Sequence, residues 1–366
     1  MNRQLVVSGR RIDDDSDCFV IAEIGHNHQG DLEQCKRMFL TAKQHGVDAV
    51  KLQKRDNRVL FTRKMYESPY LHRNSYGDTY GAHREALEFG REQYQELQRY
   101  AREIDVIFFS TAFDIPSADF LAELDMPAIK IASGDVNNIP LLQHIAGIQK
   151  PIFLSTGGAK MEDVVRAHEA ISQINSQLCI LQCTSGYPAE FSELNLRVIE
   201  TFRRAFPDCV IGLSSHDNGI AMAAVGYALG ARVVEKHFTL NRAAKGTDHA
   251  FSLEPDGLRK LVRDLRRAKA AMGDGTKRRY PSEEAPLAKM GKKIVAARDL
   301  PTGHLIVAED LAMKSPNDGL PPTDIGRVVG RRTTRTFSAD DNIELGGLED
   351  AEVMDLATRR RHEGGR

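Results

Sequence analysis

The sequence predicts an α/β fold, a (β/α)8 TIM barrel that is followed by a small β-rich domain. Three observations predict this fold. Short apolar runs recur up to about residue 272, and each is followed by an amphipathic stretch of helical periodicity. The runs are apolar at consecutive positions, which is typical of parallel strands that are buried on both faces. The composition then changes near residue 273, where glycine, proline and charged residues become dense.

The apolar runs are interpreted as the eight strands of a closed barrel. Eight β/α units in series favour a barrel over a doubly wound sheet, which rarely has so many strands in regular succession. A dinucleotide-binding sheet is also disfavoured, because no GxGxxG follows any run. The short segment before the first strand is expected to cap the barrel bottom as a hairpin. The predicted strands cover residues 19–25, 49–53, 106–113, 128–134, 151–157, 179–185, 210–216 and 232–238.

Amphipathic stretches between these runs predict the helices of the barrel. The first begins at Asp31-Leu-Glu-Gln34, which resembles a capping box, and Cys35, Phe39 and Ala42 then recur on one face. Further helices are expected at residues 91–103, 116–125, 161–175, 193–205, 218–230 and 254–272.

One connection is much longer than the others. Residues 54–90 contain four tyrosines and several arginines without clear periodicity. Loops of this length in compact domains are usually functional or disordered. Because the aromatic content is too high for a linker, we expect an ordered lid over the substrate site.

The sequence predicts two domains joined by a linker. The barrel is expected to span residues 1–275, and the Gly-, Pro- and charge-rich segment 276–293 is interpreted as the linker. Residues 294–350 contain four short β-like runs separated by turns. A module of this size is marginal alone and is expected to dock on something. Residues 351–366 are expected to form a flexible tail.

The composition excludes several classes of protein. The 50 Lys and Arg residues balance 51 Asp and Glu residues, so the charge predicts neither a nucleic-acid nor an anionic-membrane partner. No apolar run approaches the length of a spanning helix, and the N-terminus lacks an apolar signal core. The five cysteines are odd in number and form no CxxC pair, so we interpret them as reduced thiols in a cytoplasmic protein.

Polar side chains at the carboxyl ends of the strands predict an anion site. In a (β/α)8 barrel the active site lies at these ends. Two lysines and four serines there provide cationic and hydroxyl donors suited to a phosphate and a carboxylate. Each serine alone is better explained as a helix cap, and each lysine as part of a structural ion pair. The set as a whole favours an anion cradle, which consists of Lys51, Lys130, Ser133, Ser155, Ser185 and Ser214.

Two histidines predict a metal site beside the cradle. His216 and His237 end adjacent predicted strands, which lie ~5 Å apart, so both imidazoles can reach one divalent cation. Two protein ligands leave positions open for water and substrate, as a Lewis acid requires. On spacing alone, two hydrogen-bonded histidines without a metal remain an equal alternative. Cys183 is interpreted as core and not as a nucleophile.

A set of long, ordered motifs goes beyond these generic features. The chain resembles the sialic acid synthase family, which condenses phosphoenolpyruvate with an N-acylmannosamine, and several stretches are more similar to the animal-type members that take the 6-phosphorylated sugar. The C-terminal part resembles that family's antifreeze-like (SAF) domain. The motifs that carry the resemblance are IAEIGHNHQGD, KLQ, KIASGDVNN, STGG, QCTSGYP, GLSSHD, EKHFTL, KGTDHAFSLEP and KKIVAARDLPTGHLIVAEDL.

The resemblance implies roles for individual residues. Glu23 matches the catalytic carboxylate, and Asp135 stands where many members have Glu. The phosphoenolpyruvate ligands are the six cradle residues defined above, of which Ser185 replaces an Asn of many bacterial members. The metal ligands, filled by manganese or magnesium, are His216 and His237. The acceptor-sugar contacts are Gln53, Asn74, Tyr187 and Asp248.

The resemblance also implies a mechanism and an assembly. C3 of the enolpyruvate attacks the metal-polarised aldehyde, Glu23 stabilises the charge that develops at C2, and water addition releases phosphate by C–O cleavage. The family forms a domain-swapped homodimer in which an Arg of the SAF domain reaches the partner's sugar. Here Lys314-Ser315-Pro316 stands at that position.

Other functions remain open at this point. A related N-acyl sugar would give legionaminic or pseudaminic acid by the same mechanism, and a metal-dependent aldolase would use similar ligands but release pyruvate. A sugar- or ice-binding protein has no use for the catalytic set.

The long connection contains basic residues that suit a second phosphate, unless they are solvated or pair with nearby carboxylates. The basic residues are Lys54, Arg55, Arg63, Lys64, Arg73 and Arg84, and the carboxylates are Asp56, Glu67, Asp78 and Glu85.

Overall fold

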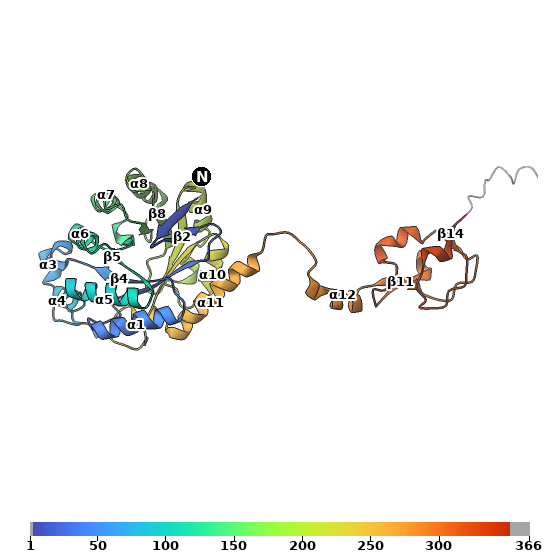
Figure 1. Ribbon diagram of the computed structural model, residues 1–366, viewed down its shortest axis with the longest axis horizontal. Helices are drawn as coiled ribbons and strands as arrows, with labels where there is room; N and C mark the ends of the chain where they lie inside the picture. The colour runs from blue at the N-terminus through green and yellow to red at the C-terminus, as the bar shows by residue number, and fades with distance from the viewer. Residues whose placement is uncertain (1–2, 352–366) are drawn as a thin grey trace, which may run out of the picture. The chain divides into compact units, whose positions relative to one another are not determined.

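The computed structural model describes residues 3–351 of the chain. The chain divides into two compact units, Met1–Asp274 and Gly275–Arg366. The first unit contains the helices and strands from β1 to α11, and the second contains α12 and β11–β14 (Figure 1). None of the helices in the described part of the chain has the length and apolar character needed to cross a bilayer.

The first unit is a closed barrel of eight parallel strands in the order β10-β3-β4-β5-β6-β7-β8-β9. This architecture confirms the predicted fold class. Each predicted strand is present, with bounds that are shorter by one to four residues in several cases. The strands are β3 (Phe19–Gly25), β4 (Ala49–Lys54), β5 (Ile107–Ala112), β6 (Ile129–Ile131), β7 (Ile152–Ser155), β8 (Leu178–Cys183), β9 (Val210–Ser215) and β10 (Val233–His237).

A helix follows every strand of the barrel. The helix after β6 was missed by the sequence pattern, although Pro140 stands in its first turn and Leu141, Leu142 and Ile145 are buried. The helices are α1 (Leu32–Gln44), α5 (Arg91–Glu103), α6 (Ile115–Glu123), α7 (Ile139–Gly147), α8 (Met161–Ser172), α9 (Val198–Ala205), α10 (Ala221–Ala228) and α11 (Pro255–Met272).

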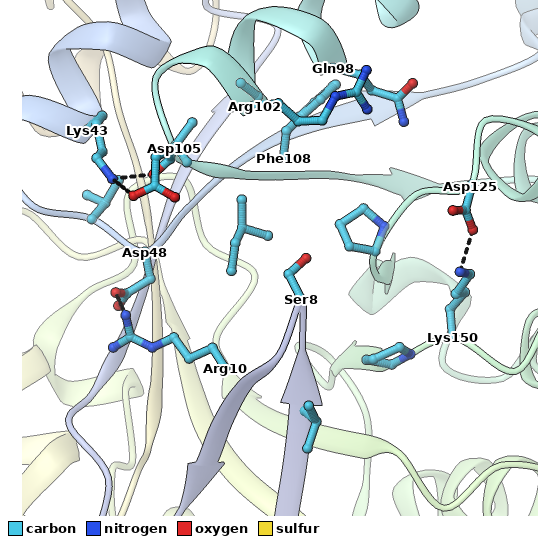
Figure 2. Close-up of a pocket in the computed structure, with 17 residues that line it drawn as sticks. Ser8, Arg10, Lys43, Asp48, Gln98, Arg102, Asp105, Phe108, Asp125 and Lys150 are labelled. Carbon is cyan, nitrogen blue, oxygen red and sulfur yellow. Dashed lines mark hydrogen bonds and ion pairs between the residues drawn. The ribbon is translucent and has the colours of Figure 1, made fainter.

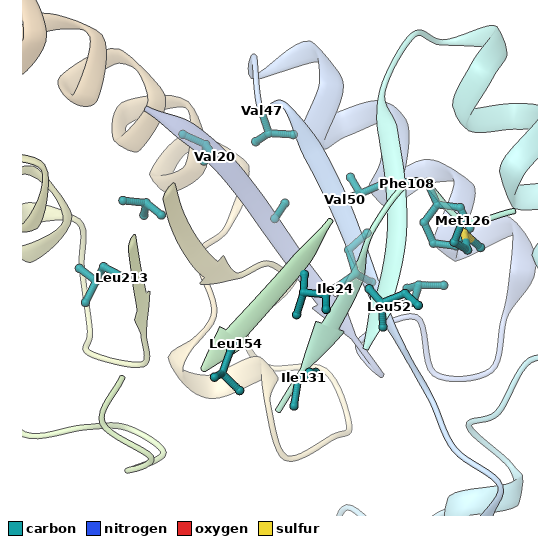
Figure 3. Close-up of a cluster of buried hydrophobic side chains, with 14 of the residues drawn as sticks. Val20, Ile24, Val47, Val50, Leu52, Phe108, Met126, Ile131, Leu154 and Leu213 are labelled. Carbon is teal, nitrogen blue, oxygen red and sulfur yellow. The ribbon is translucent and has the colours of Figure 1, made fainter. Parts of the chain in front are cut away.

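The outer faces of the strands form the main hydrophobic core with the helices. Residues at alternate positions of each strand point to this layer, as the twofold period of a strand requires. The labelled strand residues of this layer in Figure 3 are Val20, Ile24, Val50, Leu52, Phe108, Ile131, Leu154 and Leu213.

The inner faces of the strands are apolar in their first half. Phe153 stacks on Phe19 and on Phe109, with ring centroids 6.1 Å and 5.2 Å apart. The hairpin of β1 (Gln4–Val7) and β2 (Arg10–Asp13) adds Leu5, Val7 and Ile12 to this inner cluster. The barrel interior is therefore packed at its amino-terminal end, and the polar residues of the inner face lie nearer the carboxyl ends of the strands.

The long connection between β4 and α5 is ordered by short helices and aromatic contacts. It contains α2 (Asn57–Leu60), α3 (Arg63–Tyr66) and α4 (Tyr80–Glu85), whose N-caps Asp56, Thr62 and Thr79 accept hydrogen bonds from the first turns. The Tyr80 ring packs against Phe61 and Tyr70 at centroid distances of 5.0 Å and 5.4 Å.

The second unit is small and rich in β-structure. Its described elements are α12 (Glu284–Met290), β11 (Lys293–Ala296), β12 (Leu311–Lys314), β13 (Arg331–Thr333) and β14 (Leu348–Asp350), where β11 pairs with β12 and β13 with β14. Part of the predicted linker is thus helical. The core of this unit contains Ile294, Leu300, Ile306, Val328, Phe337 and Ile343. The predicted tail, 351–366, lies outside the described residues except for residue 351.

Candidate active site

A cavity of about 580 Å³ opens at the carboxyl ends of the barrel strands. Each strand of the barrel contributes residues to the lining of this cavity, and further lining residues come from the segments that directly follow the strands. The lining includes twelve of the residues that the sequence singled out, namely Glu23, Lys51, Gln53, Lys130, Ser133, Ser155, Ser185, Tyr187, Ser214, His216, His237 and Asp248.

Glu23 and Lys51 form a buried ion pair in the wall of this cavity. Lys51 Nζ lies 2.6 Å from Glu23 Oε2 and donates to Thr111 Oγ1 at 2.7 Å. Gln53 Nε2 donates to the other Glu23 oxygen at 2.7 Å. Burial raises the pKa of Glu23, against the opposing effect of Lys51, and burial lowers the pKa of Lys51. Gly25 follows at a strand irregularity with φ of 54°, which favours glycine.

Glu235 joins the two lysines and was not among the predicted site residues. Its Oε1 accepts from Lys130 Nζ at 3.0 Å and from Ser214 Oγ at 3.1 Å, while Oε2 lies 3.9 Å from Lys51 Nζ. Burial alone would raise the pKa of Glu235, but the two lysines lower it to about 2. Strand alternation could have identified it, because Glu235 and His237 share the inner face of β10.

The serines of the cradle lie around a close backbone approach at Gly157. Gly157 N donates to Ser133 Oγ at 2.9 Å, and a Cβ at position 157 would come within 2.0 Å of Ser185 Oγ. Ser155 Oγ is buried without a hydrogen-bond partner among the described residues. Unsatisfied buried hydroxyls are costly, so this atom indicates a site that a ligand completes.

His216 and His237 face each other with ring centroids 5.2 Å apart. His216 Nδ1 is 3.0 Å from the carbonyl oxygen of Thr184, which orients the ring and leaves Nε2 free to bind a metal. His237 Nδ1 is buried and has no hydrogen-bond partner in the described chain. Burial lowers the pKa of His237 to about 4, so its imidazole is neutral at pH 7, as a metal ligand must be. The pair fits a divalent cation.

Two of the predicted sugar contacts lie beside the histidines. The Tyr187 ring is 4.4 Å from the His216 ring, and Asp248 Oδ2 is 3.9 Å from His237 Nδ1. Burial would raise the pKa of Asp248, but His237 and its hydrogen bond from Thr247 lower it.

The structure does not bring Asp135 and Asn74 into the cavity lining. Asp135 follows Ser133 in a 3-10 turn, and its Oδ1 accepts from Asn138 Nδ2 at 3.2 Å. Asn74 lies in the long connection, where its Oδ1 accepts from Gly246 N at 3.3 Å. Their catalytic and sugar-binding roles stay predictions.

A second group of metal-ligating residues lies outside the mouth. The ligand atoms of His168, Asp208 and Cys209 are all within 4.8 Å of one another. His168 belongs to α8, and the other two residues immediately precede β9, so this group lies toward the amino-terminal ends of the strands. It contributes no residue to the cavity described above.

A larger cavity of about 800 Å³ lies at the opposite end of the barrel. It is lined by the β1–β2 hairpin and by residues that precede or begin β4, β5, β6 and β7 (Figure 2). Three of its four cationic side chains pair with carboxylates: Arg10 with Asp48, Lys43 with Asp105, and Lys150 with Asp125. The charges of this cavity are therefore mostly neutralised internally.

The chain matches known families over both units. The NeuB family model matches residues 38–277, and the SAF domain model matches residues 293–348. The chain is 42% identical to N-acetylneuraminate-9-phosphate synthase of Homo sapiens, over 92% of this chain and 94% of the relative. It is 34% identical to N,N'-diacetyllegionaminic acid synthase of Legionella pneumophila subsp. pneumophila, over 88% and 92%.

A solved structure supports the same relationship. The N-acetylneuraminic acid (sialic acid) synthetase of Leptospira borgpetersenii serovar Hardjo-bovis, in complex with citrate, has a TM-score of 0.69 and 30% identity, and the match covers 78% of this chain and 95% of that one. The resemblance inferred from the motifs is thereby confirmed. The chain belongs to the NeuB family, with a TIM-like barrel followed by a SAF domain.

Proposed function

We propose that the protein condenses phosphoenolpyruvate with an N-acylmannosamine acceptor, with release of inorganic phosphate. The observation that supports the proposal is that two lysines, four serines, Glu23 and the histidine pair line one cavity. The product is a nine-carbon 2-keto acid, N-acetylneuraminate or its 9-phosphate. In this reaction C3 of the enolpyruvate forms a C–C bond with the sugar aldehyde carbon, water adds at C2, and the C2–O bond to phosphate breaks, so that C2 keeps the oxygen of water as its keto group.

The cradle binds the donor. Lys51 and Lys130, with the serines around Gly157, supply the charge-assisted hydrogen bonds that a phosphate and a carboxylate require. In the free protein Glu235 accepts from Lys130 and Ser214. Before phosphoenolpyruvate binds, Glu235 keeps the lysines charged and oriented. The phosphate of the entering phosphoenolpyruvate then competes with Glu235 for the same N–H and O–H groups.

His216 and His237 would hold manganese or magnesium. The metal, when bound, supplies Lewis-acid polarisation of the acceptor aldehyde. Thr184 fixes the ring of His216 through its carbonyl oxygen, and Tyr187 covers one face of the pair.

Glu23 acts at the reacting carbon, and the polar wall positions the sugar. Glu23 is held by Lys51 and Gln53, and its negative charge stabilises the positive charge that develops at C2. Gln53, Tyr187 and Asp248 line the side of the cavity that receives the acceptor hydroxyls. Holding both reactants in line could lower the barrier by about 7–11 kcal/mol.

Acceptor-dependent phosphate release tests the proposal. We expect the full chain, with manganese, to release phosphate from phosphoenolpyruvate only when N-acetylmannosamine or its 6-phosphate is present, with one nine-carbon keto acid formed per phosphate. Cleavage of the nine-carbon keto acid to pyruvate, with no release of phosphate from phosphoenolpyruvate, would favour an aldolase. Turnover only with a different N-acyl sugar would favour the alternatives, a legionaminic or pseudaminic acid synthase.

We also propose a cytoplasmic homodimer. The SAF domain exposes three apolar residues, which a second copy of the chain could cover. Their relative exposures are 41% for Leu305, 44% for Val307 and 38% for Val329. The resemblance implies an arrangement in which each SAF domain covers the partner's barrel. A full-length protein that is active as a monomer in light scattering would refute this assembly. The five cysteines are free and buried, which fits a reducing compartment.

A further inference from the structure

We propose that Arg55 and Arg84 form a second anion subsite, which binds a phosphate monoester at the end of the acceptor remote from its aldehyde. The inference rests on the proposed function and names the substrate class of that site. Both arginines line the cavity, although they come from the long connection and not from the barrel strands.

The two guanidinium groups converge on one imidazole. Arg55 Nη1 lies 3.1 Å from His26 Nε2, and Arg84 Nη1 lies 3.4 Å from His26 Nδ1. A neutral imidazole has one acceptor nitrogen, and a charged one has none. At least one guanidinium N–H is therefore left facing a group that cannot accept it. An anion between the arginines would provide the missing acceptor.

Cations outnumber carboxylates around the two arginines, since Lys54, Arg55 and Arg84 face Glu88, and Asp248 acts on both arginines from beyond ion-pair distance. Arg84 also donates to the Tyr80 hydroxyl, from Nε at 3.1 Å and from Nη2 at 2.9 Å. The nearest carboxylate to Arg55 is Glu88, whose Oε1 is 3.9 Å from Arg55 Nη1, and Glu88 is also bound by Lys54 at 3.1 Å. Two cations thus share one carboxylate, and a third has none within ion-pair distance in the described chain.

Arg55 is buried, and its charge is only partly compensated, because it shares Glu88 with Lys54. It is 8% exposed, and its guanidinium carbon lies 3.8 Å from the Phe113 ring centroid. Burial lowers the pKa of Arg55 to about 10, with Arg84 as the next cause, so Arg55 still carries its charge at neutral pH. Buried charges are usually paired, and a dianion that hydrogen-bonds to both arginines would satisfy this requirement.

The subsite is separate from the donor cradle. Gln53 stands between them: its Nε2 donates to Glu23 Oε1 at 2.7 Å, and its Oε1 accepts from Arg55 Nη2 at 2.7 Å. One side of this amide thus faces the reacting end of the cavity and the other faces the arginines. An acceptor that extends along this wall, with its aldehyde at the histidine pair, would carry its far end toward Arg55 and Arg84.

The remaining cations of the connection do not form this subsite. Arg63, Lys64 and Arg73 are exposed and are absent from the cavity lining. Of the basic residues in this segment, only Arg55 and Arg84 therefore line the cavity. Arg63 provides a matched control for a change of charge on the same segment.

Kinetics with two acceptors test the subsite. The full chain is assayed with phosphoenolpyruvate and either N-acetylmannosamine or its 6-phosphate, and the ratio of the two kcat/KM values is measured at matched ionic strength. We expect the wild type to prefer the phosphorylated acceptor. Arg84→Gln should reduce the ratio by roughly 10- to 150-fold, Arg84→Lys by less, and Arg63→Gln should leave it unchanged.

The outcomes separate this inference from the proposed function. A wild type that prefers the neutral sugar, or an Arg84→Gln protein that keeps the wild-type ratio, overturns the subsite but leaves the condensation intact. No turnover with either acceptor overturns both. Should Arg84→Gln not fold, the wild type still decides: KM for the phosphorylated acceptor must rise with added salt more steeply than KM for the neutral one.

Discussion

The two ends of the barrel each contain a cavity, and the larger of the two is at the end without the predicted chemistry. At the amino-terminal end, three of four cations are paired with carboxylates across about 800 Å³. At the carboxyl end, a cavity of about 580 Å³ contains buried Ser155, Glu235 and His237 atoms without hydrogen-bond partners. Buried polar atoms without partners also occur elsewhere in the described chain, for example at Asn57 and His168, but of the two cavities only the one at the carboxyl end is lined by them. This difference, and not cavity volume, distinguishes the two ends.

Of the variants that test this difference between the two ends, the one that removes a proposed metal ligand should have the largest effect on activity. We expect His237→Ala to reduce turnover at least ~100-fold, because the acceptor loses the Lewis acid, while the circular dichroism spectrum stays unchanged. Excess chelator should abolish wild-type activity, and manganese or magnesium should restore it. His168→Ala, in the ligand group outside the mouth, is the control and should retain activity. Full activity in excess chelator would refute the metal site.

Lysines from the two cavities provide a matched comparison. Lys51→Ala and Lys130→Ala should each raise KM for phosphoenolpyruvate roughly 10- to 150-fold, because each loses a charge-assisted contact to the donor. KM for the sugar should change far less. Lys150→Ala, which removes an exposed pair with Asp125, should leave both constants unchanged. Unchanged donor kinetics in both mouth variants would contradict the cradle.

The close approach at Gly157 gives a sharper geometric test. Gly157→Ala places a methyl group 2.0 Å from Ser185 Oγ and 2.9 Å from Ser133 Oγ, so the cradle hydroxyls must move. Overpacking typically costs about 1–3 kcal/mol, and we expect KM for phosphoenolpyruvate to rise roughly tenfold. The control is Gly147→Ala, where a Cβ meets nothing within 4 Å. Wild-type donor affinity in Gly157→Ala would exclude these serines from the site.

The ion pairs of the amino-terminal cavity should have the smallest effect. Lys43→Ala removes the pair with Asp105, whose side chain is 97% exposed, and such solvent-screened pairs contribute little to stability. We expect a small shift in thermal unfolding and unchanged kcat and KM. A large loss of activity in this variant would show that the amino-terminal cavity takes part in the reaction.

The sequence predicted the barrel because buried parallel strands leave an apolar run that is visible without a structure. Helix α7 was missed although it is longer than α9 and α10, which were predicted; a 3-10 turn at Ser133–Asp135 and a polar segment separate it from β6. Helices α2, α3 and α4 could not be predicted, since each has four to six residues and depends on caps and on aromatic contacts formed by the folded chain.

The site residues, like the fold, could be predicted on the barrel strands but not in the long connection. Residues at strand ends, such as Lys51 and His237, could be predicted because the barrel fixes where they point. Arg55 and Arg84 could be named only among other basic residues of the connection, because their approach to His26 depends on how that segment folds. Glu235 was available from strand alternation, because it lies two residues before His237 on the inner face of β10.

The most direct test of the account follows the bridging oxygen of the donor. Phosphoenolpyruvate labelled with 18O between C2 and phosphorus is incubated with the wild-type protein, manganese and the acceptor sugar, and the released phosphate is analysed by mass spectrometry. Condensation with C–O cleavage places the label in inorganic phosphate, formed in equal amount with a nine-carbon keto acid. Unlabelled phosphate, or phosphate released without acceptor, would contradict the proposed chemistry.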